Sequence, residues 1–400
     1  MPAESVSPVS SVSEALDRWR AGERAQVLGG EFLSVLASVP DPRDRRGRRY
    51  PLAGLLAIAI LATAAGMRSY AGFATWAHTA PEDVLAQLGI RFRRPSEKTF
   101  RTVLSRLDAA DLDRRLGAYF TTQAALRDPG GLVAVALDGK TLRGALRGGA
   151  AATHLVSVFA HGARLVLGQL AVAAKSNEIP CVKMLLKILP RPVRWLVTVD
   201  AMHTQTATAT LICKTLRSHY LMIVKQNQPG VLARITALPW MAVPVVATDD
   251  TRGHGRVETR TLQILTAPRG IGFPYARQVV RITRERMVVA TGKRSVEVVH
   301  ALCSVPFEHA APTAIAAWLR QHWGIENSIH WVRDVTFDED RHTARTGTGP
   351  QTLAALRNTA LNLHRLDGAT NIAEACRITA LTPNRRLGLL NPQKPSSQAC

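Results

Sequence analysis

Two short, largely apolar runs, each ending in aspartate, place the strongest constraint on how this chain can fold. "LVAVALD" ends at Asp138 and "RWLVTVD" ends at Asp200. A strand that is apolar on both sides must be covered on both faces, as strands inside parallel α/β sheets are. Because the ends of neighbouring parallel strands lie about 5 Å apart, we expect Asp138 and Asp200 to converge despite their distance in sequence.

The segments around these runs predict an alternating α/β order. Two strands joined at "HGA" and the helix "EIPCVKMLLKIL" lie between the runs, and a helical segment at 204–218 and the strand "YLMIVK" follow the second run. A late helix, "APTAIAAWLRQHWGIENSIHWV", carries Glu326. Aspartates at the ends of the first and fourth strands, followed by a late helix with glutamate, are the layout of the ribonuclease H-like fold.

The N-terminal third predicts a separate helical domain. From Glu31 to Gln123, apolar residues recur at spacings of three and four residues, as on one face of a helix. The apolar run from Leu52 to Gly66 is short of a membrane span, so we interpret it as a buried helix begun by Pro51. Ser96 is expected to cap a helix whose basic surface either enters a DNA groove or is solvated; its cations are Lys98, Arg101 and Arg106.

These patterns together predict five regions in an α/β protein. They are a disordered leader (1–28), an all-helical N-terminal domain with DNA binding as one role (29–125), a ribonuclease H-like core in two pieces (130–225 and 307–366), a β-rich insertion (226–306) and a loose C-terminal tail (367–400).

The charge of the chain predicts a polyanionic partner. Lys and Arg number 51 against 30 Asp and Glu, which gives a net charge of +21. Nucleic acid is the partner that such a balance favours, and a merely basic surface is the alternative. The five cysteines are scattered and never spaced as C-x-x-C, so neither a disulfide framework nor a zinc module is indicated. The N-terminus does not resemble a signal peptide, and a reducing cytoplasm fits best.

Three converging carboxylates predict a metal site. Asp138, Asp200 and Glu326 would repel one another when ionised, and two Mg²⁺ ions would relieve that repulsion. Two such ions about 4 Å apart can activate a water or a 3′-hydroxyl for in-line attack on a phosphodiester. Taken singly, Asp138 could instead be a turn residue in "DGK", and Asp200 could be a helix N-cap.

The sequence also resembles a known family. "LDGKTLRGA", "KSNEIP", "VTVDAMHTQ", "YLMIVKQNQPG", "GHGRVETR" and "HWGIENSIHWVRDVTFDED" are similar to successive motifs of the DDE transposases of bacterial insertion sequences, in the subgroup that includes the H-repeat-associated proteins. The resemblance runs from about residue 31 to about residue 366.

The resemblance implies that Asp138, Asp200 and Glu326 are the metal-binding triad, acting in endonucleolytic cleavage at the element ends and in strand transfer to target DNA. It implies Mg²⁺ as cofactor, with Mn²⁺ able to substitute, and double-stranded DNA as partner. A homodimer bridging two ends, no membrane partner and a place in the bacterial cytoplasm at the nucleoid are further expectations.

Seven further residues are predicted to contact DNA. Relatives with a β insertion carry the pattern Y-x2-R-x3-E-x6-K around the glutamate. This chain has Leu319 and His322 at its first two places and Arg333 at its last. A strand with period two puts Arg256, Glu258 and Arg260 on one side, which predicts either DNA contact or a cross-strand ion network. The predicted DNA contacts are Lys225, Asn227, Arg256, Arg260, Trp323, His330 and Arg333.

The sequence leaves two other functions open. A domesticated or decayed relative would keep the basic surface and bind DNA without catalysis. A structure-specific nuclease on the same core would cleave branched DNA without strand transfer.

Overall fold

The structure is a computed structural model that describes residues 27–127, 132–142, 153–172, 178–189, 193–253, 255–382 and 385–390. The chain divides into two compact units. Unit 1 comprises Met1–Pro129, Gly139–Cys181 and Ile325–Cys400, and unit 2 comprises Gly130–Asp138 and Val182–Gly324. All but the last two residues of the predicted leader lie outside the described residues. This division does not test the predicted domain bounds, which stay a prediction.

Unit 2 is built on parallel strands. β1 (Leu132–Leu142) pairs with β4 (Arg194–Val199), and β4 pairs with β5 (His219–Val224). β4 and β5 are buried except at their first residues, as their apolar sequences predict. The connecting helices are α8 (Glu178–Ile188), α9 (Thr206–Thr210) and the π-helical η4 (Leu211–Thr215). The strands and helices expected around Asp138 and Asp200 are therefore confirmed.

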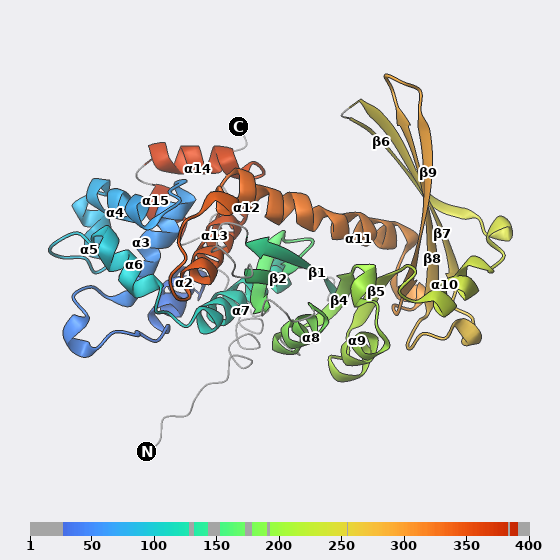
Figure 1. Ribbon diagram of the computed structural model, residues 1–400, viewed down its shortest axis with the longest axis horizontal. Coiled ribbons are helices and arrows are strands. Elements are labelled where there is room, and N and C mark those ends of the chain that lie inside the picture. Colours follow the sequence, from blue (N-terminus) through green and yellow to red (C-terminus); the bar gives the residue numbers. More distant parts are fainter. Residues whose placement is uncertain are drawn as a thin grey trace, which may run out of the picture. The chain divides into compact units, whose positions relative to one another are not determined.

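The β-rich tract of unit 2 is an antiparallel meander that extends the same sheet (Figure 1). β9 pairs with β5, and successive hairpins join the remaining strands. β6 and helix α10 (Pro229–Thr236) were not predicted, because "VVATDDTRG" alternates little and carries three charges. The meander strands are β6 (Val245–Gly253), β7 (Arg256–Thr266), β8 (Gln278–Val288) and β9 (Arg294–Cys303).

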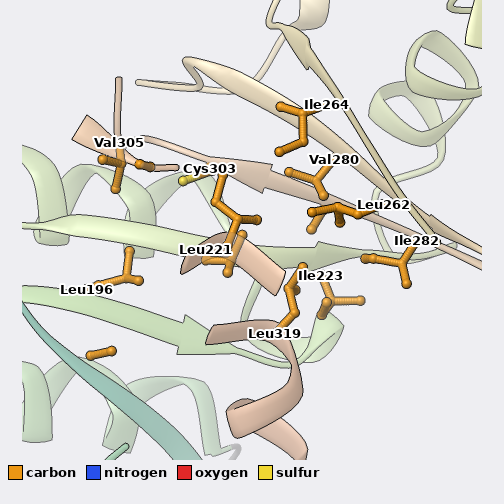
Figure 2. Close-up of a cluster of buried hydrophobic side chains, with 14 of the residues drawn as sticks. Leu196, Leu221, Ile223, Leu262, Ile264, Val280, Ile282, Cys303, Val305 and Leu319 are labelled. Atoms are coloured by element: carbon orange, nitrogen blue, oxygen red, sulfur yellow. The ribbon is translucent and has the colours of Figure 1, made fainter. Parts of the chain in front are cut away.

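One hydrophobic cluster holds the meander, the parallel strands and helix α11 (Pro312–Ile325) together (Figure 2). Leu221 and Ile223 of β5 lie in it with Leu319 of α11, which is 4% exposed. Leu319 stands at the first place of the family pattern described above, where tyrosine is expected. In this chain that position belongs to the core of unit 2.

Unit 1 contains the N-terminal helices, a β hairpin and the C-terminal helices. Its helices before the hairpin are α2 (Val27–Ala37), α3 (Leu52–Ala64), α4 (Tyr70–Thr79), α5 (Glu82–Gln87), α6 (Glu97–Leu104) and α7 (Ala109–Arg127). α3 is buried on nearly all sides against α2, α4 and α13, and Pro51 is its N-cap, as expected. Ser96 caps α6 by accepting a hydrogen bond from Thr99 N. No helix in the described part of the chain is long and apolar enough to cross a membrane.

The hairpin and the C-terminal helices complete unit 1. β2 (Thr153–Ala160) and β3 (Leu165–Val172) pair antiparallel, and Asn362 of α13 bonds both backbone groups of Val166 on β3. The predicted loose tail is partly wrong, because α14 forms within it and Asn371 caps its N-terminus. The late elements are η8 (Glu326–His330, π-helical), α12 (Trp331–Val335), α13 (Gly349–Leu366), α14 (Ile372–Leu381) and α15 (Arg385–Gly388).

The strand order in the sheet is β3-β2-β1-β4-β5-β9-β8-β7-β6. An antiparallel hairpin followed by parallel β1, β4 and β5 is the ribonuclease H-like arrangement. The chain thus has the predicted α/β fold, with its β-rich insertion joined to the sheet through β9.

Candidate active site

Asp138 and Asp200 directly follow the last paired residues of two neighbouring parallel strands. Leu137 of β1 pairs with Val199 of β4, so the residue that follows each is an aspartate. Strands in a sheet lie about 4.8 Å apart, which sets the two backbones side by side. Asp138 is half-buried and Asp200 is exposed. β1 continues to Leu142, so the prediction that this strand ends at Asp138 is wrong; only its parallel pairing with β4 ends there.

His322 on α11 lies beside these two aspartates, within unit 2. Its Nδ1 is 3.0 Å from Thr198 Oγ1, and that hydroxyl also donates to the carbonyl oxygen of Val135 at 3.2 Å. Burial lowers the pKa of His322, and the carboxylates of Asp138 and Asp200 oppose that shift. In the sequence, His322 marks a departure from the family pattern. Its packing against the end of β4 could not be read from spacing.

Lys225 and Asn227 lie near Asp200, as predicted for the end of β5. The Lys225 ammonium is 3.8 Å from the Asp200 carboxylate, and both side chains are more than half exposed. Asn227 Nδ2 donates to the carbonyl oxygen of Ala201, directly after Asp200. The structure thus brings both residues to the aspartate pair, and their contact with DNA stays a prediction.

Glu326 opens a π-helical segment, Glu326–His330, between α11 and α12. A π-helical turn inserts one extra residue in a helix and is frequent at functional sites. The side chains of Glu326 and Trp323 lie outside what the structure describes, so their predicted roles stay predictions.

Arg333 and His330 are interior residues of unit 1. The Arg333 guanidinium is 0% exposed and bonds both carboxylate oxygens of Glu339, at 2.7 and 2.8 Å. His330 is 3% exposed. Both side chains are enclosed in this structure, which does not favour the predicted contacts with DNA; those contacts stay predictions.

Lys140 ties the segment after Asp138 to helix α12. Its ammonium, 8% exposed, bonds Asp334 and lies 3.9 Å from Asp340, both in unit 1. Two of the carboxylates near Glu326 in sequence are therefore engaged by a lysine. They are structural acids here.

Comparison with known protein families identifies the family of the chain. Residues 129–363 match the family model described as "Transposase DDE domain", and residues 33–120 match its associated domain, "DDE_Tnp_1-associated". The chain belongs to the DDE transposases.

Individual relatives are similar over most of their length. "Putative transposase YncI" of Escherichia coli O157:H7 is 29% identical over 353 residues, which covers 84% of this chain and 87% of that protein. "H repeat-associated putative transposase YhhI" of Escherichia coli K12 is 25% identical, covering 83% and 90%. A piggyBac transposase in a synaptic complex with hairpin DNA aligns with 92% of this chain and 80% of its own, at a TM-score of 0.39 and 11% identity.

In this DDE transposase, the charged face of the insertion is a cross-strand ion network. Glu258 of β7 bonds Arg260 beside it and Arg284 of β8, the latter at 2.8 Å. Asp249 of β6 bonds Arg260 at 3.3 Å and Arg320 of α11 at 2.9 Å. The ion-network interpretation therefore applies to Arg260. Arg256 is exposed near the hairpin tip, and its contact with DNA stays a prediction.

Proposed function

We propose that this transposase cleaves DNA at the ends of an insertion sequence and joins those ends to target DNA, with Asp138, Asp200 and Glu326 as its catalytic carboxylates. The observation that carries the proposal is the register of β1 and β4, in which Leu137 opposite Val199 puts two aspartates at one point of the sheet. The family match supports the third carboxylate.

The carboxylate oxygens of this site are suitable ligands for a divalent metal ion. Asp138 and Asp200 offer hard oxygen ligands of the kind Mg²⁺ prefers, and Lys225, 3.8 Å from the Asp200 carboxylate, is exposed and able to turn away. Among the described side chains no group of three or more His, Cys, Asp or Glu could hold a metal ion, and the Glu326 side chain is not among them. We propose two Mg²⁺ ions, or Mn²⁺ in their place, held by the three carboxylates; when bound, they would activate the attacking oxygen and stabilise the departing one.

The reaction exchanges one phosphorus–oxygen bond for another in each step. In cleavage, water attacks phosphorus and the 3′ oxygen of the element end departs. In strand transfer, that 3′-hydroxyl attacks a target phosphodiester, and the 3′ oxygen of the broken target strand departs. Neither step requires a covalent protein–DNA intermediate. His322 would hold α11 against the ends of β1 and β4 through Thr198.

Single amide substitutions test the three carboxylates. Asp138→Asn, Asp200→Asn and Glu326→Gln should each lower metal-dependent nicking of an element-end duplex by roughly 10³-fold or more, because a neutral amide removes a charged ligand in the reacting site. Affinity for the duplex should be retained. Nicking and strand transfer are measured on a labelled duplex with Mg²⁺ and with Mn²⁺.

Asp250→Asn is the matched control, since it makes the same change at an exposed aspartate of β6. It should leave nicking unchanged. Full activity in any of the three site variants would overturn the assignment. Binding without nicking in the unaltered protein would favour the non-catalytic alternative, and nicking without strand transfer would favour a nuclease.

A further inference from the structure

A basic cavity lies in unit 1, lined by residues of α12, α13 and α14. Its volume is about 740 Å³, and its lining includes Arg68, Arg164, Arg365 and Arg377. No aspartate or glutamate lines it. Four guanidinium groups around one cavity without a lining carboxylate repel one another, and an anion inside would relieve that repulsion.

Arg365 of α13 is the fixed arginine of the cavity. Its terminal nitrogens donate to the carbonyl oxygens of Arg164 and Ser328, and its guanidinium carbon is 5.5 Å from the centre of the Phe159 ring. Its Nε is buried and has no hydrogen-bond partner among the described residues. Burial and the neighbouring Arg164 lower the pKa of Arg365 to about 9. This guanidinium is therefore held in place and left short of negative charge.

The other three arginines are exposed on the same cavity. Arg68 bonds Asp338 at 3.0 Å, whereas Arg164 and Arg377 form no ion pair with a carboxylate among the described residues. Burial raises the pKa of the Cys376 thiol to about 12, and the positive charges of Arg377 and Arg68 oppose that shift. Both guanidinium groups therefore lie close enough to this cavity-lining residue to affect its charge.

The N-terminus of α14 and an aromatic ring complete the lining. Thr370, Asn371, Ile372 and Ala373 all line the cavity at the start of this ten-residue helix, where unpaired backbone N–H groups favour anions. Trp331 of α12 also lines it and is 56% exposed. Cations beside an exposed aromatic ring are the combination that nucleic-acid strands bind.

We propose that this cavity binds phosphate groups of the DNA backbone, outside the carboxylate site. The proposal deepens the proposed function and rests on it only in taking DNA as the partner. The cavity would position the DNA without reading its sequence, because phosphate contacts carry no base information.

The test uses the full-length protein and removes the two exposed, unpaired cations. Arg164→Ala combined with Arg377→Ala is compared with Arg217→Ala combined with Arg345→Ala, which removes two exposed arginines that lie outside the cavity and outside the N-terminal domain. Binding is measured in an Asp138→Asn background by fluorescence anisotropy. The probes are a 30-base-pair element-end duplex and one of its strands, at several salt concentrations, with inorganic pyrophosphate as competitor.

The cavity pair should weaken DNA binding about tenfold near physiological salt and lower the slope of log K against log salt by about 2, one for each lost phosphate contact. Arg164→Lys with Arg377→Lys should restore most of both. Parental affinity and slope in the cavity pair, or an equal loss in the control pair, would overturn the proposal. If the cavity pair loses binding of pyrophosphate but keeps the parental affinity for DNA, the proposal is also overturned, since the cavity would then be a site for free anions.

The rate of nicking at saturating DNA distinguishes a failure of the phosphate cavity from a failure of the carboxylate assignment. With Asp138 intact, the cavity pair should nick at the parental rate once DNA is saturating. If Asp138→Asn still nicks while the cavity pair loses affinity, the carboxylate assignment fails and the phosphate cavity stands.

Discussion

At the residue scale, Arg333 is held by Glu339, a buried carboxylate that lies outside the pattern around Glu326. Burial alone would raise the pKa of Glu339, but Arg333 and Arg357 more than offset this and lower it to about 2. Arg357 Nη1 is 2.9 Å from Glu339 Oε1, so one buried carboxylate serves two guanidinium groups. The cation that ends the family pattern is therefore part of an ionic core in unit 1.

Removing that carboxylate should destabilise the protein strongly. Glu339→Gln leaves two buried guanidinium groups without a counter-charge, which costs about 3–5 kcal/mol at pH 7. Because the folded pKa of Glu339 is depressed, its contribution is present above its unfolded pKa and is lost as the pH falls toward about 2. The difference from the parent should therefore shrink in acid. Urea denaturation at pH 7 and pH 4 measures it.

The exposed Glu308 provides the control for this experiment. Glu308→Gln makes the same chemical change without burial and should alter the free energy of unfolding by less than about 0.5 kcal/mol. Equal stability of the Glu339→Gln variant and the parent would contradict the ionic-core interpretation.

At the scale of elements, the approach of α7 to β3 depends on a missing side chain. A Cβ atom at Gly117 would overlap the carbonyl oxygen of Leu167, a backbone atom that cannot turn aside. Asp113, one turn earlier on α7, accepts a hydrogen bond from the backbone N–H of Gln169 at 2.6 Å. Helix and strand are thus fixed by a close backbone contact and a buried hydrogen bond.

Gly117→Ala should lower the free energy of unfolding by about 1–3 kcal/mol, although alanine is the better helix former, because the overlap must be relieved by moving α7. Gly324→Ala is the matched case, since a Cβ atom there meets nothing within 4 Å. It should raise stability by up to about 1 kcal/mol. Thermal denaturation of both variants checks the signs, and a stabilised Gly117→Ala variant would show that α7 packs less tightly than described.

At the scale of the whole molecule, the three candidate carboxylates fall in different units. Asp138 and Asp200 belong to unit 2, which ends at Gly324, and Glu326 is the second residue of the segment Ile325–Cys400 of unit 1. The proposed function requires the assembly of all three carboxylates at one metal site.

Iron-directed cleavage of the protein backbone should report that assembly. With Fe²⁺ in place of Mg²⁺, and with ascorbate and peroxide, the DNA-bound protein should be cut near Asp138, near Asp200 and near Glu326, because a metal held by all three is close to each segment. Asp200→Asn should suppress all three cuts. Cuts near the two aspartates alone would mean that Glu326 is not a ligand in the complex. Mass spectrometry of the fragments locates them.

Local sequence by itself determined the parallel strands before Asp138 and Asp200, the Pro51 and Ser96 helix starts and the strand pattern of β7, β8 and β9. These depend on periodicity and capping, which act over a few residues. The tertiary structure alone decided that Arg333 is buried, that His322 faces two aspartates and that four arginines share a cavity. Those outcomes depend on partners such as Glu339, Thr198 and Arg164, and burial by remote segments leaves no trace in local spacing.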